Sequence, residues 1–187
     1  MELKWTKHGV VREKKSLSEL QNDFRRKVIE YNPGLIGFSV LEITYDQGLE
    51  LAKAIEDLPI PVIFGGIYPT FAPKIVLKES SIDMICEGEG EEMFVELANN
   101  LEQGKDITNI LNLTVKKDGK IFRSGQEVTL DDLPTGDNIY GEQTGLRRPQ
   151  THIGKTLLPP DYSIYENKRF LKKMGGKVVR TVAMELS

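Results

Sequence analysis

Apolar residues recur with two different periods in the first third of the chain. In residues 16–34 they return every three or four positions, and Ser16 with Glu19 has the spacing of a capping box. A Pro-Gly pair then stops the pattern, so it predicts one helix with a single buried stripe. The next segment, LIGFSV at 35–40, is short and apolar, as in a strand that is covered on both faces.

This passage from strand to helix is repeated along the chain. Thr44 and Gln47 repeat the capping-box spacing and predict that a second helix begins there. Two further apolar strands are expected at 61–64 and 82–86, with a loop and a short helix that has Pro73 in its first turn between them. A fourth helix is expected from about Glu91, and Gly104 is placed to end it.

The pattern changes after residue 110. Two strand-like segments flank Asp118-Gly119, which is a strong hairpin signal. From residue 133 to 176 no period is sustained, and a long surface connection is expected. We therefore predict an α/β fold with an open, mostly parallel sheet and helices on both faces, Rossmann-like or flavodoxin-like, plus a β-hairpin. The domain is expected to span residues 1–135, with a linker over 136–187.

Unusual residues follow all three predicted parallel strands. The strands end in Ser39-Val40-Leu41, in Gly65-Gly66 and in the segment from Glu87 to Glu91. Ligands of open parallel sheets bind at the carboxyl ends of the strands, so these three loops are expected to meet at one binding edge. Adjacent glycines would let a bulky ligand approach the backbone there, and the alternative is a tight turn from strand to helix.

Composition and charge exclude several classes of function. The chain of 187 residues has a net charge of −3 and offers no basic field for nucleic acid. It has no apolar run of membrane length and no signal-peptide pattern, so we expect a cytoplasmic protein with no membrane partner. The single cysteine, Cys86, lies in an apolar strand and is expected to be a core residue and not a nucleophile.

No catalytic or metal-binding constellation is recognised in the sequence. There is no dinucleotide fingerprint and no phosphate-binding loop. The glutamates at 87, 89, 91 and 92 could hold a metal ion, but loop glutamates ahead of a helix more often serve its amino terminus. We therefore predict no catalytic residues and no metal ligands.

The order Ser39-x-Leu41, then Gly65-Gly66 after 23 residues, then GEGEE at 88–92, resembles a known family. It is similar to the cobalamin-binding domain that precedes the catalytic barrel in cobalamin-dependent radical S-adenosylmethionine proteins. The phrases IGFSVLEIT, PVIFGGIYPT, ICEGEGEEMFVEL and LDDLP occur here in the family's order, and the resemblance covers residues 17–135. The later segment PPDYSIYE resembles the lead-in to the barrel.

The resemblance implies cobalamin as the cofactor, with a role for each matching residue. The Ser39 hydroxyl would bond to the dimethylbenzimidazole tail, Leu41 would shape the slot, and Gly65 and Gly66 would let the tail pass close to the backbone. Tyr68, Pro69 and Thr70 would lie beside it, and Gly88 with Glu89 would complete the binding edge.

The resemblance also implies a division of labour within a larger protein. The [4Fe-4S] cluster and S-adenosylmethionine would belong to a radical barrel after residue 187, since a cluster needs several thiolates and this chain has one cysteine. This chain would hold the cofactor for methyl transfer or related radical chemistry and would not catalyse it alone.

The chain departs from the family pattern at its amino end. The Asp-x-His-x-x-Gly segment that supplies a cobalt ligand in some relatives is missing, and the portion before Ser39 is short. Either MELKWTKHGVV supplies one abbreviated strand, or the chain begins inside the domain. Two other functions therefore remain open: a cofactor-free docking module with the same fold, and a flavodoxin-like enzyme, for which the sequence offers no nucleophile or base.

Overall fold

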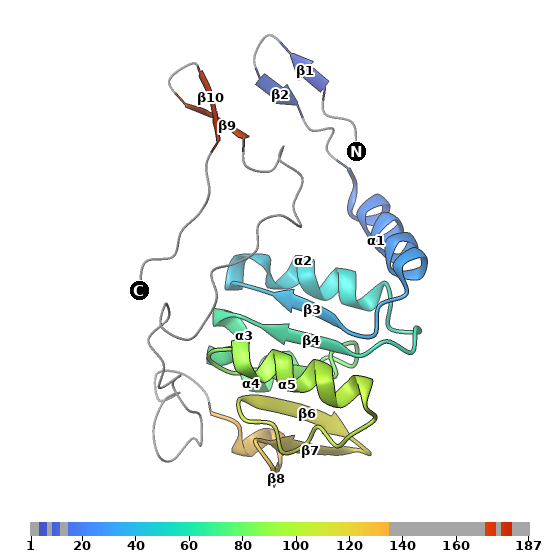
Figure 1. Ribbon diagram of the computed structural model, residues 1–187, viewed down its shortest axis with the longest axis vertical. Helices are drawn as coiled ribbons and strands as arrows, with labels where there is room; N and C mark the ends of the chain where they lie inside the picture. The colour runs from blue at the N-terminus through green and yellow to red at the C-terminus, as the bar shows by residue number, and fades with distance from the viewer. Residues whose placement is uncertain (1–3, 7–8, 12–14, 135–170, 175–176, 181–187) are drawn as a thin grey trace. The chain divides into compact units, whose positions relative to one another are not determined.

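A computed structural model describes residues 4–6, 9–11, 15–134, 171–174 and 177–180 (Figure 1). The chain divides into two units, residues 1–148 and 149–187. The six-stranded sheet and all five α-helices of the described residues belong to the first unit. Most of the expected linker at 136–187 lies outside the described residues.

The first helix, α1 (Leu17–Tyr31), forms as its sequence pattern predicts. The Ser16 hydroxyl accepts a hydrogen bond from the Glu19 N–H, and the Glu19 carboxylate accepts one from the Ser16 N–H at 2.8 Å. At the other end Asn32 adopts a left-handed conformation, with φ of 50°, and closes the helix. The capping box and the Asn32 cap therefore fix both ends of α1.

Three parallel strands follow, and they are β3 (Ile36–Ser39), β4 (Val62–Gly65) and β5 (Met84–Cys86). Helix α2 (Glu42–Lys53) joins the first two, and α3 (Ile67–Phe71) and α4 (Pro73–Leu77) join the last two. The prediction that Thr44 begins the second helix is wrong. Leu41 is the N-cap, and the Thr44 hydroxyl, in the first turn, accepts from the Leu41 N–H at 2.9 Å.

The other half of the sheet is antiparallel. Strands β6 (Leu113–Lys117), β7 (Lys120–Arg123) and β8 (Gln126–Val128) continue it in the order β3-β4-β5-β6-β7-β8 (Figure 1). The predicted hairpin turn is confirmed, because Asp118 and Gly119 have φ of 52° and 76°. A short 3-10 helix, η1 (Leu130–Asp132), follows β8.

The expected mostly parallel sheet is therefore wrong, and the sheet is mixed. Two of its pairings are parallel, β3 with β4 and β4 with β5, and the three that follow are antiparallel. After α5 (Glu91–Glu102) the chain returns along the sheet and enters β6 beside the end of β5, with Leu113 opposite Cys86. Strand β6 must therefore run opposite to β5.

Helices cover both faces of the sheet, as predicted. One core cluster joins Phe64 and Ile85 of the sheet to side chains of α1, α2 and α4. The other joins Ile63, Met84 and Leu113 to Met93 and Leu97 of α5. Alternate residues of the central strands thus enter opposite cores, which explains why their sequences read as continuous apolar runs.

Two further hairpins lie outside the main sheet. Strands β1 (Lys4–Thr6) and β2 (Gly9–Val11) pair only with each other, as do β9 (Leu171–Met174) and β10 (Lys177–Arg180). The amino-terminal segment therefore forms two strands and not the single abbreviated strand considered above. No helix in the described residues is long and apolar enough to cross a bilayer.

Candidate functional site

The carboxyl ends of the three parallel strands lie side by side, as predicted. Ser39 is the register partner of Gly65 on the neighbouring strand, and Phe64 is the partner of Ile85. The loops that leave these strands are the first rim loop (residues 39–41), the second (65–66) and the third (87–90). The structure therefore brings Ser39 and Gly65 together and sets the third loop beside them.

Gly66 is required by contacts within the chain itself. Its φ is +98°, and a Cβ at this position would lie 2.8 Å from the Val40 carbonyl oxygen and 3.4 Å from Ser39 Oγ. The Val40 N–H also donates to the Gly65 carbonyl at 2.9 Å. At Gly66, the alternative considered from the sequence, a tight turn from strand to helix, therefore explains the glycine.

Gly65 has more open surroundings. An added Cβ there would meet only the Cys86 Cβ, at 3.4 Å, which is ordinary van der Waals contact. Its φ lies outside the left-handed region. The two adjacent glycines thus differ: Gly66 is fixed by packing, while Gly65 leaves space at the end of its strand.

Thr70 links the second rim loop to the third. Its hydroxyl donates to the Gly66 carbonyl and accepts from the Gly88 N–H, both at 2.9 Å, and the residue is 4% exposed. Because one buried hydroxyl bonds both loops, their spacing is fixed by α3. Thr70 is therefore a support beneath the rim and not an exposed contact residue.

The other two predicted residues of α3 differ in burial, since Pro69 is buried and Tyr68 is half-buried. The Tyr68 ring packs on Tyr45 with 4.6 Å between ring centroids. Burial raises the pKa of Tyr45 to about 12, with a further contribution from the charge of Glu79. The half-buried Tyr68 therefore packs on Tyr45, which belongs to the core.

The third rim loop contains a buried carboxylate. Glu87 has no exposed surface and accepts from Arg123 Nε at 3.0 Å and from Arg123 Nη2 at 2.9 Å. The Thr114 hydroxyl donates to the same carboxylate. Sequence reasoning did not find the role of Arg123, since the pairing spans 36 residues and no local pattern reports it.

The remaining glutamates do not form a metal site in the described part of the chain. No group of three or more potential metal ligands is present there. Glu91 and Glu92 lie in the first turn of α5, where negative charge is favourable. Glu89 is exposed, and its carbonyl accepts from Asn112 Nδ2 at 3.1 Å.

Cys86 is a core residue, as predicted. It is 5% exposed, and burial raises its thiol pKa to about 12, helped by the charges of Glu87, Glu91 and Glu89. A thiol with this pKa is protonated at neutral pH and is a poor nucleophile.

Large apolar side chains are exposed around the first two rim loops. Leu41, at the start of α2, is 47% exposed, and Ile43 one residue into the helix is 85% exposed. Ile67 and Phe71, at the two ends of α3, are 61% and 45% exposed. Sequence reasoning identified Leu41 alone, although an apolar residue in the first turn after a strand was the available signal for Ile43 and Ile67. These four residues place exposed apolar surface around the two loops.

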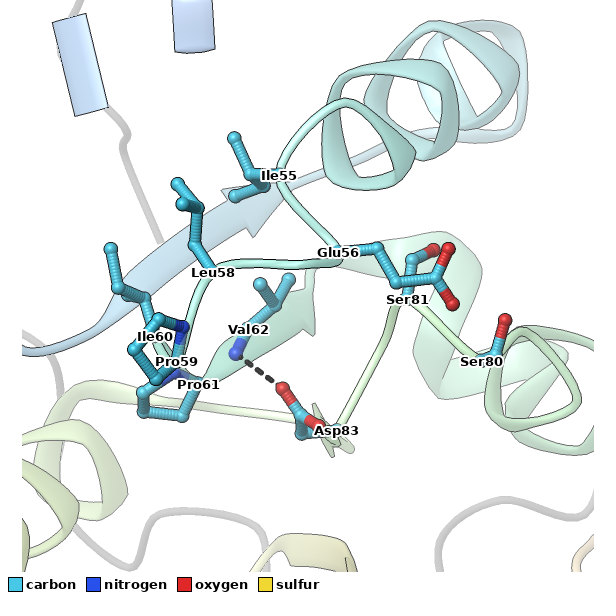
Figure 2. A pocket seen from close by; sticks show the side chains of 10 residues that line it. All are labelled: Ile55, Glu56, Leu58, Pro59, Ile60, Pro61, Val62, Ser80, Ser81 and Asp83. Carbon is cyan, nitrogen blue, oxygen red and sulfur yellow. Dashed lines mark hydrogen bonds between the residues drawn. The ribbon is translucent and has the colours of Figure 1, made fainter. Parts of the chain in front are cut away.

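A pocket of about 280 Å³ lies at the opposite edge, where the parallel strands begin (Figure 2). Its walls come from the segments that precede β4 and β5, among them Leu58, Ile60 and Ser81. Asp83 fixes one wall, because its carboxylate accepts from the Val62 N–H at 2.8 Å. None of the residues predicted from the sequence to bind a cofactor lines this pocket.

Comparison with known proteins shows what this chain is similar to. Residues 13–98 match the family model described as B12 binding domain. The chain is 28% identical over 103 residues to an uncharacterized methyltransferase, PH0819, of Pyrococcus horikoshii. The aligned region covers 54% of this chain and 22% of that protein. It is 29% identical over 121 residues to the anaerobic magnesium-protoporphyrin IX monomethyl ester cyclase of Rubrivivax gelatinosus, covering 60% of this chain and 22% of the cyclase.

The fold is also found in a solved structure, that of the radical S-adenosylmethionine methyltransferase TsrM from Kitasatospora setae. The TM-score is 0.51 at 22% identity, over 56% of this chain and 21% of TsrM. The chain thus spans about a fifth of the length of each of these relatives. Residues 13–98 thus match the B12-binding family model, and the chain resembles the N-terminal region of cobalamin-dependent radical S-adenosylmethionine enzymes.

Proposed function

We propose that this domain binds cobalamin at the rim of its parallel strands, as the cofactor-holding part of a radical S-adenosylmethionine enzyme. The observation that carries the proposal is the convergence of the three loops with the family's residues at one edge. Ser39 lies opposite Gly65, and the Thr70 hydroxyl joins Gly66 to Gly88. This edge also carries exposed apolar side chains, which suit a large and partly apolar ligand.

The residues of the rim fit the nucleotide tail of the cofactor. Among the described residues, the Ser39 hydroxyl has no hydrogen-bond partner, so it is free to bond to the dimethylbenzimidazole tail. Gly65 leaves open space beside it, and Leu41 supplies apolar surface. Gly88 and Glu89 complete the rim, while Tyr68, Pro69 and Thr70 support it from below.

The chemistry would be divided between this domain and the rest of a longer protein. Cobalamin supplies methyl-carrying and radical reactivity when it is bound. The domain's own residues would bind the cofactor, orient it and cover its tail. The cluster, S-adenosylmethionine and the substrate would belong to the radical barrel, and methyl transfer and ring formation are the two reaction classes that the relatives' names suggest.

The test is to incubate the chain with hydroxocobalamin, desalt it and record the visible spectrum. The native chain is expected to retain the cofactor. A Gly65→Phe variant fills the open space and should weaken binding at least about tenfold. Gly34→Phe is the matched control, because a Cβ at Gly34 meets nothing within 4 Å and the residue lies at the other end of β3.

The Gly34→Phe control should bind cobalamin like the native chain. Gly66 is unsuitable for this experiment, since any side chain there collides with the Val40 backbone and disturbs the fold itself. A folded native chain that elutes without colour would contradict the proposal. The cofactor-free docking module, which would use the same exposed apolar rim, would then be the better explanation.

A further inference from the structure

The buried ion pair between Glu87 and Arg123 connects the two halves of the sheet. Glu87 directly follows β5 and opens the third rim loop, whereas Arg123 ends β7 in the antiparallel half. The guanidinium donates through Nε and Nη2 to the two different carboxylate oxygens, at 3.0 and 2.9 Å. The side chain of Glu87 is 0% exposed and that of Arg123 is 11% exposed.

Such a pair fixes orientation more than it adds stability. Removing two charges from water costs about as much as their attraction returns, so an apolar pair of the same volume often stabilises a fold equally well. A guanidinium that donates two parallel hydrogen bonds to a carboxylate, however, requires the carboxylate to lie in the guanidinium plane and to face its two N–H groups. The Thr114 hydroxyl adds a third donor to the Glu87 carboxylate. The Glu87 side chain is therefore held in a single orientation.

The backbone on either side of that carboxylate is fixed as well. The Glu87 N–H donates to the Asn112 carbonyl at 2.9 Å, and Asn112 Nδ2 donates to the Glu89 carbonyl at 3.1 Å. The Gly88 N–H donates to Thr70, and Gly88 has φ of +84°. Two of these three anchors come from the segment that leads into β6, and the ion pair comes from β7. The antiparallel half thus supports one side of the rim loop, and α3 supports the other.

We propose that Arg123 is a positioning residue, which acts through Glu87 to hold the third rim loop in the conformation that receives cobalamin. Its effect on the cofactor rests on the proposed function, whereas its effect on the loop does not. The antiparallel hairpin then helps to hold the cofactor-binding loop in place, in addition to extending the sheet. A pre-ordered loop loses less conformational entropy when the ligand binds.

The experiment replaces the whole buried polar cluster with apolar residues, in the variant Glu87→Met, Thr114→Val, Arg123→Met. Because no charge is left unpaired, we expect this triple variant to fold with a melting temperature close to that of the native chain. Amide hydrogen exchange of the ligand-free protein, followed residue by residue, reports the loop directly. Exchange at Gly88, Glu89 and Gly90 should be at least about tenfold faster than in the native chain.

Cobalamin binding by the same variant should be about tenfold weaker. The matched control is Lys120→Met with Glu127→Met, which removes an exposed ion pair from the same hairpin. This control should leave both loop exchange and cofactor affinity unchanged. If the triple variant does not fold, Arg123→Lys is the replacement, since it keeps the charge but loses the bidentate geometry.

The outcomes separate this proposal from the proposed function. Unchanged exchange at residues 88–90 in a folded variant would overturn the positioning role, and so would faster exchange with undiminished cofactor affinity. If the native chain binds no cobalamin but the variant's loop exchanges faster, the loop is positioned as inferred and the ligand assignment is what fails.

Discussion

The two ends of the same three strands are built in opposite ways. At the carboxyl end, hydrogen bonds run between loops, through Thr70 and through the Val40 N–H, and several large apolar side chains are exposed. At the amino end there is a measurable pocket, with proline-containing walls at Pro59 and Pro61. The residues predicted to bind the cofactor lie at the open end, and none of them lines the pocket. The hollow of about 280 Å³ and the convergence of the predicted loops therefore lie at opposite ends of the strands.

The first prediction is the largest, and it tests the rigidity of the rim. Gly66→Ala should lower the free energy of unfolding by about 2–4 kcal/mol, since the new Cβ meets the Val40 carbonyl and the backbone φ of +98° disfavours any side chain. Denaturant unfolding measures this, with Gly34→Ala as the control at the other end of β3. If the two variants had equal free energies of unfolding, the carboxyl end at Gly66 would be no more tightly packed than the amino end at Gly34.

The second prediction concerns the thiol beneath the rim. With a pKa of about 12, Cys86 should react with a thiol reagent at pH 8 at least about a hundredfold more slowly than an exposed cysteine. Reaction kinetics in native buffer and in denaturant measure the difference. If the Cys86 thiol reacted as fast in the native protein as in the unfolded one, the rim loops would have to open readily. That would contradict the hydrogen bonds that join these loops through Thr70.

The third prediction addresses the amino end. Asp83→Ala leaves the Val62 N–H without its acceptor and should cost about 1–2 kcal/mol of unfolding free energy. Hydroxocobalamin retention should not change, because Asp83 lies at the opposite ends of the strands. Weakened retention in this variant would show that the two ends are coupled.

The fourth prediction is the smallest and concerns the exposed Asp106. Lys117 and Thr108 hold the pKa of Asp106 at about 2, below its ordinary value of 3.8. Because the folded pKa is depressed, the stabilisation is present above pH 3.8 and is lost as the pH falls towards 2. Comparing the acid unfolding curves of the native chain and Asp106→Asn measures it. Solvent screening should keep the difference small, and a shift as large as that of Gly66→Ala would contradict this account.

Local patterns explain how much of the fold could be predicted from the sequence. The capping box of Ser16, the Asp118-Gly119 turn and the apolar strands rest on neighbouring residues, and the structure bears them out. The direction of β6 could not be found in this way, because it depends on how far the chain after α5 returns along the sheet. Strand direction is a property of the connection and not of the strand.

In the candidate site, too, some features could be predicted from the sequence and others depend on the tertiary arrangement. The loops with Ser39, Gly65 and Gly88 were expected to meet because carboxyl ends of parallel strands share an edge, and they do. The contact that would meet a Cβ at Gly66 comes from Val40 in the first rim loop, and the partner of Glu87 comes from 36 residues away. Neither could be derived without the tertiary arrangement.

The strand order also has a consequence for folding kinetics. Each strand of the six-stranded sheet neighbours the next in sequence. The turns β6-β7 and β7-β8 close over a few residues, whereas the pairs β3-β4, β4-β5 and β5-β6 enclose whole helices. Short loops have the lower closure entropy, so β6, β7 and β8 are expected to assemble early in refolding. Arg123 would then be in place in the folded hairpin before β5 pairs with β6. The ion pair between Glu87 and Arg123 would form when β5 joins the sheet.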